Sequence, residues 1–334
     1  MTARSGNGNS AIVQTLARHQ INDLAWDTCI ASSPQRILYG YSWYLDLVLP
    51  APSWKWIGLV IADEAGNYQA VMPVPLRQKR LLGIPYSWVV HQPFFCQFLG
   101  VFSPDQLLNP IPFLRFMQQC FRYGSTFCID QVASADEPLP FGRINAEATQ
   151  VLTLSLGYKA LYQGYSRDRK QNLKRALSAN WTIMESTDPE PLITLFRENH
   201  TNDIDGVVAD WAYDILRNLV ATLSNRNLMT LRYACHNGRT EAGALFVCEG
   251  NRIIYLFNAA SDTGRRGNAR TLLIDQIIRE KAGMNLLLDF ESPTKPSIRQ
   301  FYQSFGAVEE PFSRHRWSRL NVIERIGRLA MKRL

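Results

Sequence analysis

Residues 252–278 read RIIYLFNAASDTGRRGNARTLLIDQII, and this stretch decides the fold. It starts as a strand rich in β-branched and aromatic residues and ends as an amphipathic helix. Between the two, Gly264 and Gly267 allow tight turns and a close approach of the backbone to a ligand. Because the amides of residues 265–269 open the helix, free N–H groups and the positive end of the helix dipole meet at one point. Such a point suits a pyrophosphate.

A strand, a glycine-rich loop and a helix are weak evidence by themselves, because such a loop can also bind nothing and only turn the chain. The stretch lacks the GxxxxGK[ST] pattern of NTP-hydrolysing proteins and the GxGxxG pattern of dinucleotide-binding proteins. Neither NTP hydrolysis nor redox chemistry with a dinucleotide is therefore favoured.

The alternation of strands and helices continues on both sides of this stretch. Hairpins are predicted at 56–76 and at 228–248, the second around the strong turn signal Asn237-Gly238. Because Pro73 and Pro75 cannot donate backbone hydrogen bonds, we expect residues 69–76 at an edge or a strand end. The predicted helices are 21–31, 42–48, 106–123, 168–179, 190–200, 211–223, 270–282 and 297–305, and the remaining predicted strands are 86–91, 127–132, 149–154, 252–260 and 285–290.

Each predicted hairpin is preceded by helices and followed by a helix and a strand. This repetition indicates two copies of one α/β module, which agrees with a length of 334 residues. The boundary is expected in the Pro/Gly-rich residues 140–150. A single large mixed sheet is the alternative.

The composition is that of a globular protein, with 46% hydrophobic and 19% charged residues. No apolar run reaches the roughly 20 residues of a membrane-spanning helix. Residues 1–12 are predicted to be a flexible leader, because the polar N-terminal residues lack the apolar core of a signal peptide. Six cysteines scattered without metal-ligand spacing predict neither a zinc site nor a disulfide framework, so we expect a cytoplasmic protein without a metal.

Two segments around the strand and helix resemble the GNAT acetyltransferases. Residues 264–269, GRRGNA, resemble the pyrophosphate loop of that family, usually Gln/Arg-x-x-Gly-x-Gly/Ala, with Gly267 and Ala269 in the last two positions. Gly264 stands where the family has Gln or Arg, and Arg265 or Arg266 are the candidates to replace that side chain. Residues 298–307 resemble a later family helix in which a Tyr, here Tyr302, precedes a Gly by four residues.

The chain as a whole resembles the FemAB-like branch of this superfamily, which carries two GNAT folds in tandem. The matching segments are 91–102, 165–176 and 288–291, followed by 301–306. The resemblance implies an α/β fold of two tandem GNAT-like domains, each a mixed, mostly antiparallel sheet flanked by helices. We expect them at 13–145 and 146–320, before a basic amphipathic tail helix at 321–334.

The same resemblance implies an N-acyltransferase that moves an acyl group directly from an acyl-CoA cosubstrate to a small-molecule or peptide amine. Backbone N–H groups near Asn258 and Ala259 would stabilise the oxyanion, and Tyr302 would protonate the leaving thiolate. Asp289 or Glu291 would orient or deprotonate the amine. The alternatives are a helix tyrosine packed inward and acids that cap a loop. The residues predicted to hold the cosubstrate are Asn258, Ala259, Gly264, Arg265, Arg266, Gly267, Asn268 and Ala269.

Positive charge gathers in two helical segments of a chain whose net charge is +7. Arg167, Lys170 and Lys174 share one helix face and are candidate contacts for the phosphates of CoA, tRNA or an anionic lipid. The basic tail at 321–334 could lie on an anionic membrane surface or dock on protein. The first of these segments has the alternative of a solvated helix face.

Three functions therefore remain open. The first is acyl transfer from acyl-CoA. The second is a FemAB-type peptidyltransferase that uses aminoacyl-tRNA on a cell-wall precursor. The third is a non-catalytic GNAT-fold protein whose basic surface holds nucleic acid or lipid.

Overall fold

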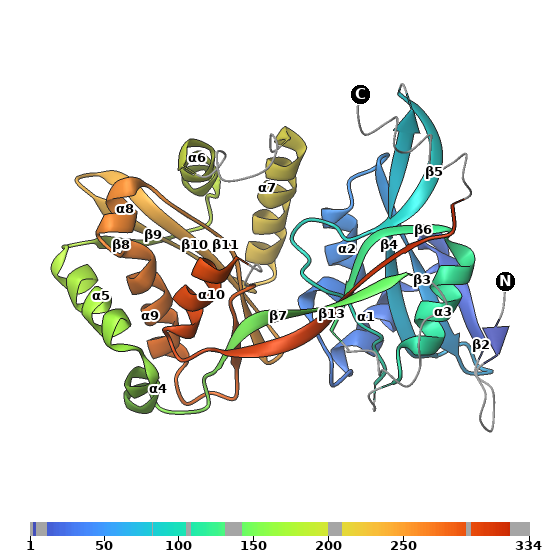
Figure 1. Ribbon diagram of the computed structural model, residues 1–334, viewed down its shortest axis with the longest axis horizontal. Helices are drawn as coiled ribbons and strands as arrows, with labels where there is room; N and C mark the ends of the chain where they lie inside the picture. Colours follow the sequence, from blue (N-terminus) through green and yellow to red (C-terminus); the bar gives the residue numbers. More distant parts are fainter. Residues whose placement is uncertain are drawn as a thin grey trace. The chain divides into compact units, whose positions relative to one another are not determined.

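The computed structural model describes residues 3–4, 12–81, 83–104, 108–130, 142–199, 209–291 and 295–320. The chain divides into two compact units (Figure 1). Unit 1 contains residues 1–147 and 311–334, and unit 2 contains residues 148–310. The sequence predicted instead that 311–320 belong with the second domain. The predicted tail helix at 321–334 and most of the predicted leader lie outside the described residues.

Unit 1 is a mixed sheet with helices, in the strand order β1-β2-β3-β4-β5-β6-β13. Its neighbouring strands are antiparallel except for the parallel pair β5 and β6. The strands are β1 (Ala3–Arg4), β2 (Ile12–Ala17), β3 (Trp54–Ala62), β4 (Tyr68–Leu81), β5 (Ile84–His91), β6 (Tyr123–Ile129) and β13 (Val308–Ser318). The helices are η1 (Arg18–Gln20), α1 (Asp23–Ala31), η2 (Leu38–Gly40), α2 (Ser42–Val48) and α3 (Ile111–Cys120).

Unit 2 has the strand order β7-β12-β11-β10-β9-β8, with β11 and β12 parallel and the other pairs antiparallel. The strands are β7 (Arg143–Thr153), β8 (Thr182–Ser186), β9 (Met229–His236), β10 (Arg239–Glu249), β11 (Arg252–Ala260) and β12 (Leu287–Asp289). The helices are α4 (Tyr158–Gly164), α5 (Arg167–Ser178), α6 (Glu190–Asn199), α7 (Asp210–Asn225), α8 (Asp262–Arg266), α9 (Ala269–Lys281) and α10 (Pro296–Gln303).

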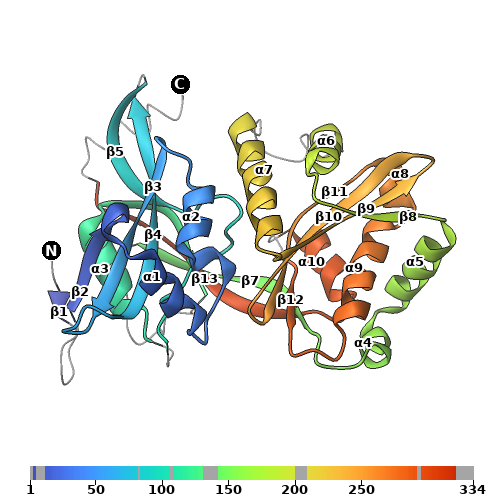
Figure 2. The ribbon, with the colours of Figure 1, turned by 180° about the vertical axis from the view of Figure 1, so that it is seen from behind.

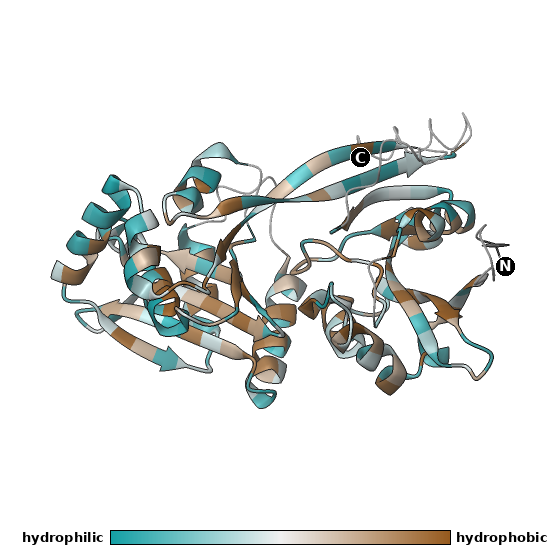
Figure 3. Cartoon of the chain, turned by 90° about the horizontal axis from the view of Figure 1, so that it is seen from below, coloured by the Kyte–Doolittle hydropathy of each residue, from teal (hydrophilic) through white to brown (hydrophobic). Residues whose placement is uncertain are grey.

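Helices cover both faces of the unit 2 sheet (Figures 1 and 2). On one face α4, α5, α9 and α10 bury an apolar core against β7, β10, β11 and β12. On the other face α6 packs on β10 and β11, where the Phe196 and Phe257 rings lie 4.8 Å apart between centroids. Hydrophobic stretches follow the strands within each unit, whereas several outer helices are largely hydrophilic (Figure 3). The apolar face of each element therefore lies against its sheet.

The two units repeat one plan, as the sequence predicted. In unit 1, the antiparallel strands β3, β4 and β5 lead into α3 and the parallel strand β6. In unit 2, the antiparallel strands β9, β10 and β11 lead into α9 and the parallel strand β12. The predicted turn between β9 and β10 is confirmed, because both Asn237 and Gly238 have positive φ. The α/β fold class is thus confirmed.

The strand prediction for residues 69–76 is confirmed at the two prolines, which lie where β4 has only β3 as a neighbouring strand. Residues 69–76 belong to β4, which pairs with β3 on one side and with β5 on the other. The pairing with β5 begins only at Leu76, so Pro73 and Pro75 lie in the part of β4 that has no β5 partner. Each proline can therefore direct its hydrogen-free nitrogen away from β3 without losing a ladder bond.

In the part of the chain that the structure describes, no helix is both long and apolar enough to cross a membrane.

Candidate functional site in unit 2

The strands β11 and β12 separate at the centre of unit 2. They pair only from Arg252 to Ile254, because β12 ends at Asp289 while β11 continues to Ala260. A register shift in the β10–β11 ladder at Leu245/Phe246 places an extra residue, Leu256, in β11. Such a bulge bends the strand. The far end of β11, which carries Asn258 and Ala259, therefore has an edge without a β12 partner among the described residues, where the sequence places the oxyanion site.

A polar cluster lies at this end of β11. The Asn258 Oδ1 atom accepts a hydrogen bond of 2.9 Å from the Arg270 guanidinium, which comes from the first turn of α9. Asn258 also hydrogen-bonds the hydroxyl of Tyr302 on α10, whose ring is stacked on Phe290 at 4.6 Å between centroids. Burial raises the pKa of Tyr302 to about 12. The phenol is therefore neutral near pH 7 and keeps the proton that a general acid needs.

The structure separates the two predicted acids. Glu291 lies close enough to Tyr302 for its charge to raise the pKa of that phenol further, and its backbone turns with a φ of 44°. Asp289 is fully buried, and its carboxylate accepts hydrogen bonds from Thr149 Oγ1 at 2.7 Å and Arg252 Nη1 at 2.8 Å. Because side chains alternate along a strand, Asp289 faces the side of the sheet opposite Phe290. Asp289 thus stabilises the sheet through Arg252, and only Glu291 lies beside Tyr302.

The predicted phosphate loop is mostly a helix. Residues 262–266 form α8, and the amides of Gly264, Arg265, Gly267 and Asn268 already donate to acceptors in residues 261–265. Arg265 pairs with Asp262 and donates to the carbonyl oxygen of Ala260 at 2.9 Å, whereas Arg266 is exposed. These amides and Arg265 are therefore engaged within the chain, which differs from the expectation of an open glycine loop.

The amides that precede the first helical hydrogen bond lie after α8, at the start of α9. Asn268 adopts a left-handed conformation with a φ of 55° and makes no side-chain cap. The first helical hydrogen bond runs from Leu272 N to Asn268 O, so the amides of Ala269, Arg270 and Thr271 precede it. The first turn of α9 contains no acidic side chain. The positive end of this helix thus meets no acidic side chain in its own first turn, which suits an anion.

A buried arginine reinforces the positive charge at this point. Arg169 on α5 is 5% exposed, donates from Nε to Ser304 Oγ at 2.8 Å, and donates from Nη1 to Thr271 Oγ1 in the first turn of α9. Its guanidinium lies 4.2 Å from the centroid of the Phe301 ring, and that of Arg270 lies 5.5 Å from it. Burial, and then the charge of Arg270, lower the pKa of Arg169 to about 10. Among the described residues, neither arginine pairs with a carboxylate.

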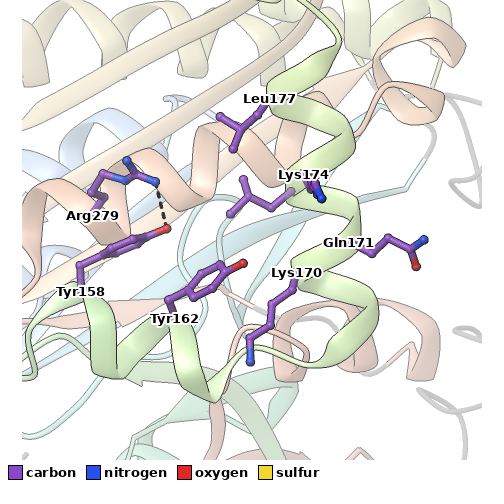
Figure 4. Close-up of a pocket in the computed structure, with 8 residues that line it drawn as sticks. Tyr158, Tyr162, Lys170, Gln171, Lys174, Leu177 and Arg279 are labelled. Carbon is purple, nitrogen blue, oxygen red and sulfur yellow. Dashed lines mark hydrogen bonds between the residues drawn. The ribbon is translucent and has the colours of Figure 1, made fainter.

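Two of the three predicted cations of the basic helix meet in a separate pocket. Figure 4 shows this pocket of about 420 Å³ between α4, α5 and α9. Its lining includes Tyr158, Tyr162, Lys170, Lys174, Leu177 and Arg279. Arg167 is exposed and does not line it.

The sequence reasoning missed Arg169 and Arg270, which carry most of the charge at the start of α9. A signal for Arg169 was present: it shares the spacing i, i+4 and i+7 with Leu173 and Ala176, which are buried on the same helix face. An arginine on an apolar helix face indicates a buried charge with a specific role. A signal for Arg270 was also present: it is a cation in the first turn of a predicted helix, and the helix dipole disfavours a cation at that position.

Comparison with known proteins bears out the family resemblance. Residues 166–290 match the family described as "Acetyltransferase (GNAT) domain". Comparison with curated protein sequences gives no match.

Solved structures resemble the chain over most of its length. FemX has a TM-score of 0.62 at 12% identity, over 90% of this chain and 96% of that one. A tandem GNAT protein from the clavulanic acid biosynthesis pathway, solved without AcCoA, has a TM-score of 0.52 at 13% identity, over 91% and 97%. L-PGS from Bacillus licheniformis has a TM-score of 0.52 at 10% identity, over 90% and 93%. At these identities the likeness shows the fold. Residues 166–290 of unit 2 therefore match the GNAT acetyltransferase domain, and the chain as a whole has the fold of the tandem GNAT proteins.

Proposed function

We propose that this protein is an N-acyltransferase that moves an acyl group from an acyl-CoA to an amine without a covalent enzyme intermediate. One observation carries the choice of donor. At the start of α9, the amides that precede the first helical hydrogen bond converge with the guanidinium groups of Arg169 and Arg270, and neither arginine pairs with a carboxylate among the described residues. Clustered positive charge at the positive end of a helix is unfavourable, and a pyrophosphate would relieve it. The structure of the tandem GNAT protein from the clavulanic acid pathway is described as being without AcCoA. AcCoA is an acyl-CoA, so this description agrees with the proposed donor.

The reacting thioester is proposed to lie along the open edge of β11. The acceptor amine attacks the thioester carbonyl carbon after losing a proton to Glu291. The oxyanion that forms is stabilised by backbone N–H groups near Asn258 and Ala259. When the intermediate collapses, the carbon–sulfur bond breaks and the thiolate takes a proton from Tyr302, which Asn258 orients. Glu291 and Tyr302 thus act as base and acid from neighbouring positions.

The donor is tested by thermal denaturation with CoA and acetyl-CoA. A ligand that binds the native state at a hundred times its Kd stabilises it by about 2.7 kcal/mol, so the melting temperature rises. Arg270→Gln should lose most of this shift. The matched change Arg266→Gln, on an exposed arginine of α8, should keep it. The absence of a shift with either ligand at millimolar concentration would contradict an acyl-CoA donor.

A second candidate donor is aminoacyl-tRNA, as the FemAB-like resemblance implies. The observation that favours it is the row of exposed cations on α5, Arg167, Lys174 and Arg175, which suits a phosphate backbone. Under this candidate, CoA leaves the melting temperature unchanged and a charged tRNA raises it at low salt. The acceptor would then be the amine of a peptide precursor.

A further inference from the structure

The pocket between α4, α5 and α9 is distinct from the proposed donor site. Arg279 lies ten residues after Ala269 on α9, which corresponds to about 15 Å along the helix. The floor of the pocket is apolar and aromatic: Tyr158 and Tyr162 lie 6.0 Å apart between ring centroids, and Leu173 also lines the pocket. The proposed transfer from acyl-CoA makes no use of this pocket, although Lys174, which lines it, is also one of the cations that favour the aminoacyl-tRNA candidate.

Cations surround that apolar floor (Figure 4). The Lys170 ammonium lies 5.5 Å from the centroid of the Tyr162 ring, and the Arg279 guanidinium lies 4.5 Å from that of Tyr158. Lys174 adds a third cation from the exposed side of α5. None of the described residues that line the pocket carries a carboxylate. The site is thus built for a ligand with a negative charge and an apolar part.

The aromatic floor is held in a fixed position from below. Asp275 is 1% exposed and accepts hydrogen bonds from the hydroxyls of Tyr158 at 2.8 Å and Tyr165 at 3.0 Å. Arg279 also donates to the Tyr158 hydroxyl at 3.1 Å. Because the tyrosine and the arginine are tied to a buried carboxylate, little side-chain freedom is lost when a ligand binds.

Large apolar side chains are exposed at the pocket and in the segments that adjoin α4 and α9. Leu177 on its rim is 57% exposed, and Leu156, two residues before Tyr158, is 56% exposed. Met284 is 46% exposed, and the preceding amide of Gly283 donates to the carbonyl oxygen of Leu156 at 2.9 Å, so Met284 and Leu156 lie close together. Exposed aliphatic side chains beside cations are the pattern of a membrane-surface contact.

We propose that this pocket binds the phosphate headgroup of an anionic lipid, with Lys170, Lys174 and Arg279 on the phosphate. Leu156, Leu177 and Met284 then enter the acyl-chain region of the bilayer surface. A soluble phosphate or an RNA backbone would use the cations equally well, but it would leave these three aliphatic side chains in water. These exposed aliphatic side chains are therefore what favours a lipid.

The test is co-sedimentation of the full chain with vesicles of phosphatidylcholine, with and without phosphatidylglycerol. Binding should require phosphatidylglycerol and fall as salt increases. Lys174→Ala should weaken it about 5-fold and the double change Lys170→Ala/Lys174→Ala about 30-fold. Arg175→Ala removes a neighbouring exposed charge that does not line the pocket, and it should change binding less than 2-fold.

The apolar rim has its own pair of variants. Leu177→Gln should weaken vesicle binding, whereas Leu24→Gln, on a leucine of unit 1 that is 79% exposed, should not. Unchanged circular dichroism shows that each variant is folded. The proposal is overturned by equal losses in Lys174→Ala and Arg175→Ala, by vesicle binding that no variant changes, or by failure to bind phosphatidylglycerol. It is also overturned if inorganic phosphate or tRNA binds through Lys170 and Lys174 while vesicles do not.

Discussion

Tyr302 combines burial with a polar partner at the end of β11, where the acyl group is proposed to bind. It is 5% exposed, its ring packs on Phe290, and its hydroxyl reaches Asn258 at the open end of β11. Any buried tyrosine hydroxyl needs a polar partner, but the partner of Tyr302 lies on the strand where the acyl group is proposed to bind. The environment therefore supports the role of general acid.

Tyr302→Phe should lower kcat by about 100-fold or more, since it removes the proton donor for the leaving thiolate. The ring and its packing remain, so the melting-temperature shift with CoA should persist. Steady-state kinetics with an acetyl-CoA donor measures the first effect, and thermal denaturation the second. A variant with the rate of the wild type would exclude Tyr302 from the mechanism.

His315 on β13 predicts how stability depends on pH. It is 1% exposed, and burial lowers its pKa from the ordinary 6.5 to about 4. Because the unfolded chain binds this proton more tightly, the contribution of His315 to the free energy of unfolding is complete above pH 6.5 and is lost as the pH falls toward 4. This contribution is about 3 kcal/mol in total. Urea denaturation at pH 7 and pH 4.5 should show the loss, and His315→Gln should reduce this difference; an unchanged pH dependence in the variant would contradict the assignment.

At the scale of the element, α8 explains why the chain departs from the family pattern at Gly264. A Cβ atom at Gly264 would lie 2.1 Å from the carbonyl oxygen of Glu241 on β10. No side chain fits there without moving the backbone of α8 or β10. The Gln or Arg of the family pattern is thus excluded by packing, and Arg169 and Arg270 supply positive charge nearby.

Gly264→Ala should lower the free energy of unfolding by about 2 kcal/mol or more, because the contact is with backbone that cannot rotate away. Gly164→Ala is the matched control, since a Cβ atom there meets nothing within 4 Å. That change in α4 should be neutral or slightly stabilising. Chemical denaturation of both variants gives the comparison, and equal stabilities would show that α8 does not pack on β10 as described.

At the scale of the whole molecule, the last described strand belongs to the unit that begins the chain. β13 pairs with β6, and Trp317 on β13 is 2% exposed and donates to the carbonyl oxygen of Phe121 at 2.8 Å. Its ring covers Gly124, where a Cβ atom would lie 2.3 Å from it. The core of unit 1 is therefore completed by residues that follow unit 2 in the sequence.

Trp317→Ala should destabilise unit 1 by about 3–5 kcal/mol, through the lost burial and the cavity that remains. Hydrogen–deuterium exchange should become faster in β6 and stay slow in α9, since α9 packs within unit 2. Faster exchange in α9 alone would contradict the assignment of β13 to unit 1.

The sequence by itself determined most of the order of the elements and the repeat of two α/β modules, and it predicted a site at the junction of β11 and α9. These follow from local patterns: Asn237-Gly238 specifies its turn, and apolar periodicity distinguishes strand from helix. It also singled out Asn258, Glu291 and Tyr302, which the structure brings together. Tertiary structure alone decided three further points. Asp289 pairs with Arg252, the amides that precede the first hydrogen bond of α9 begin at Ala269, and Arg169 carries a buried charge. Each of these depends on a partner far away in the chain, and spacing along a sequence does not reveal which distant side chain a buried charge meets.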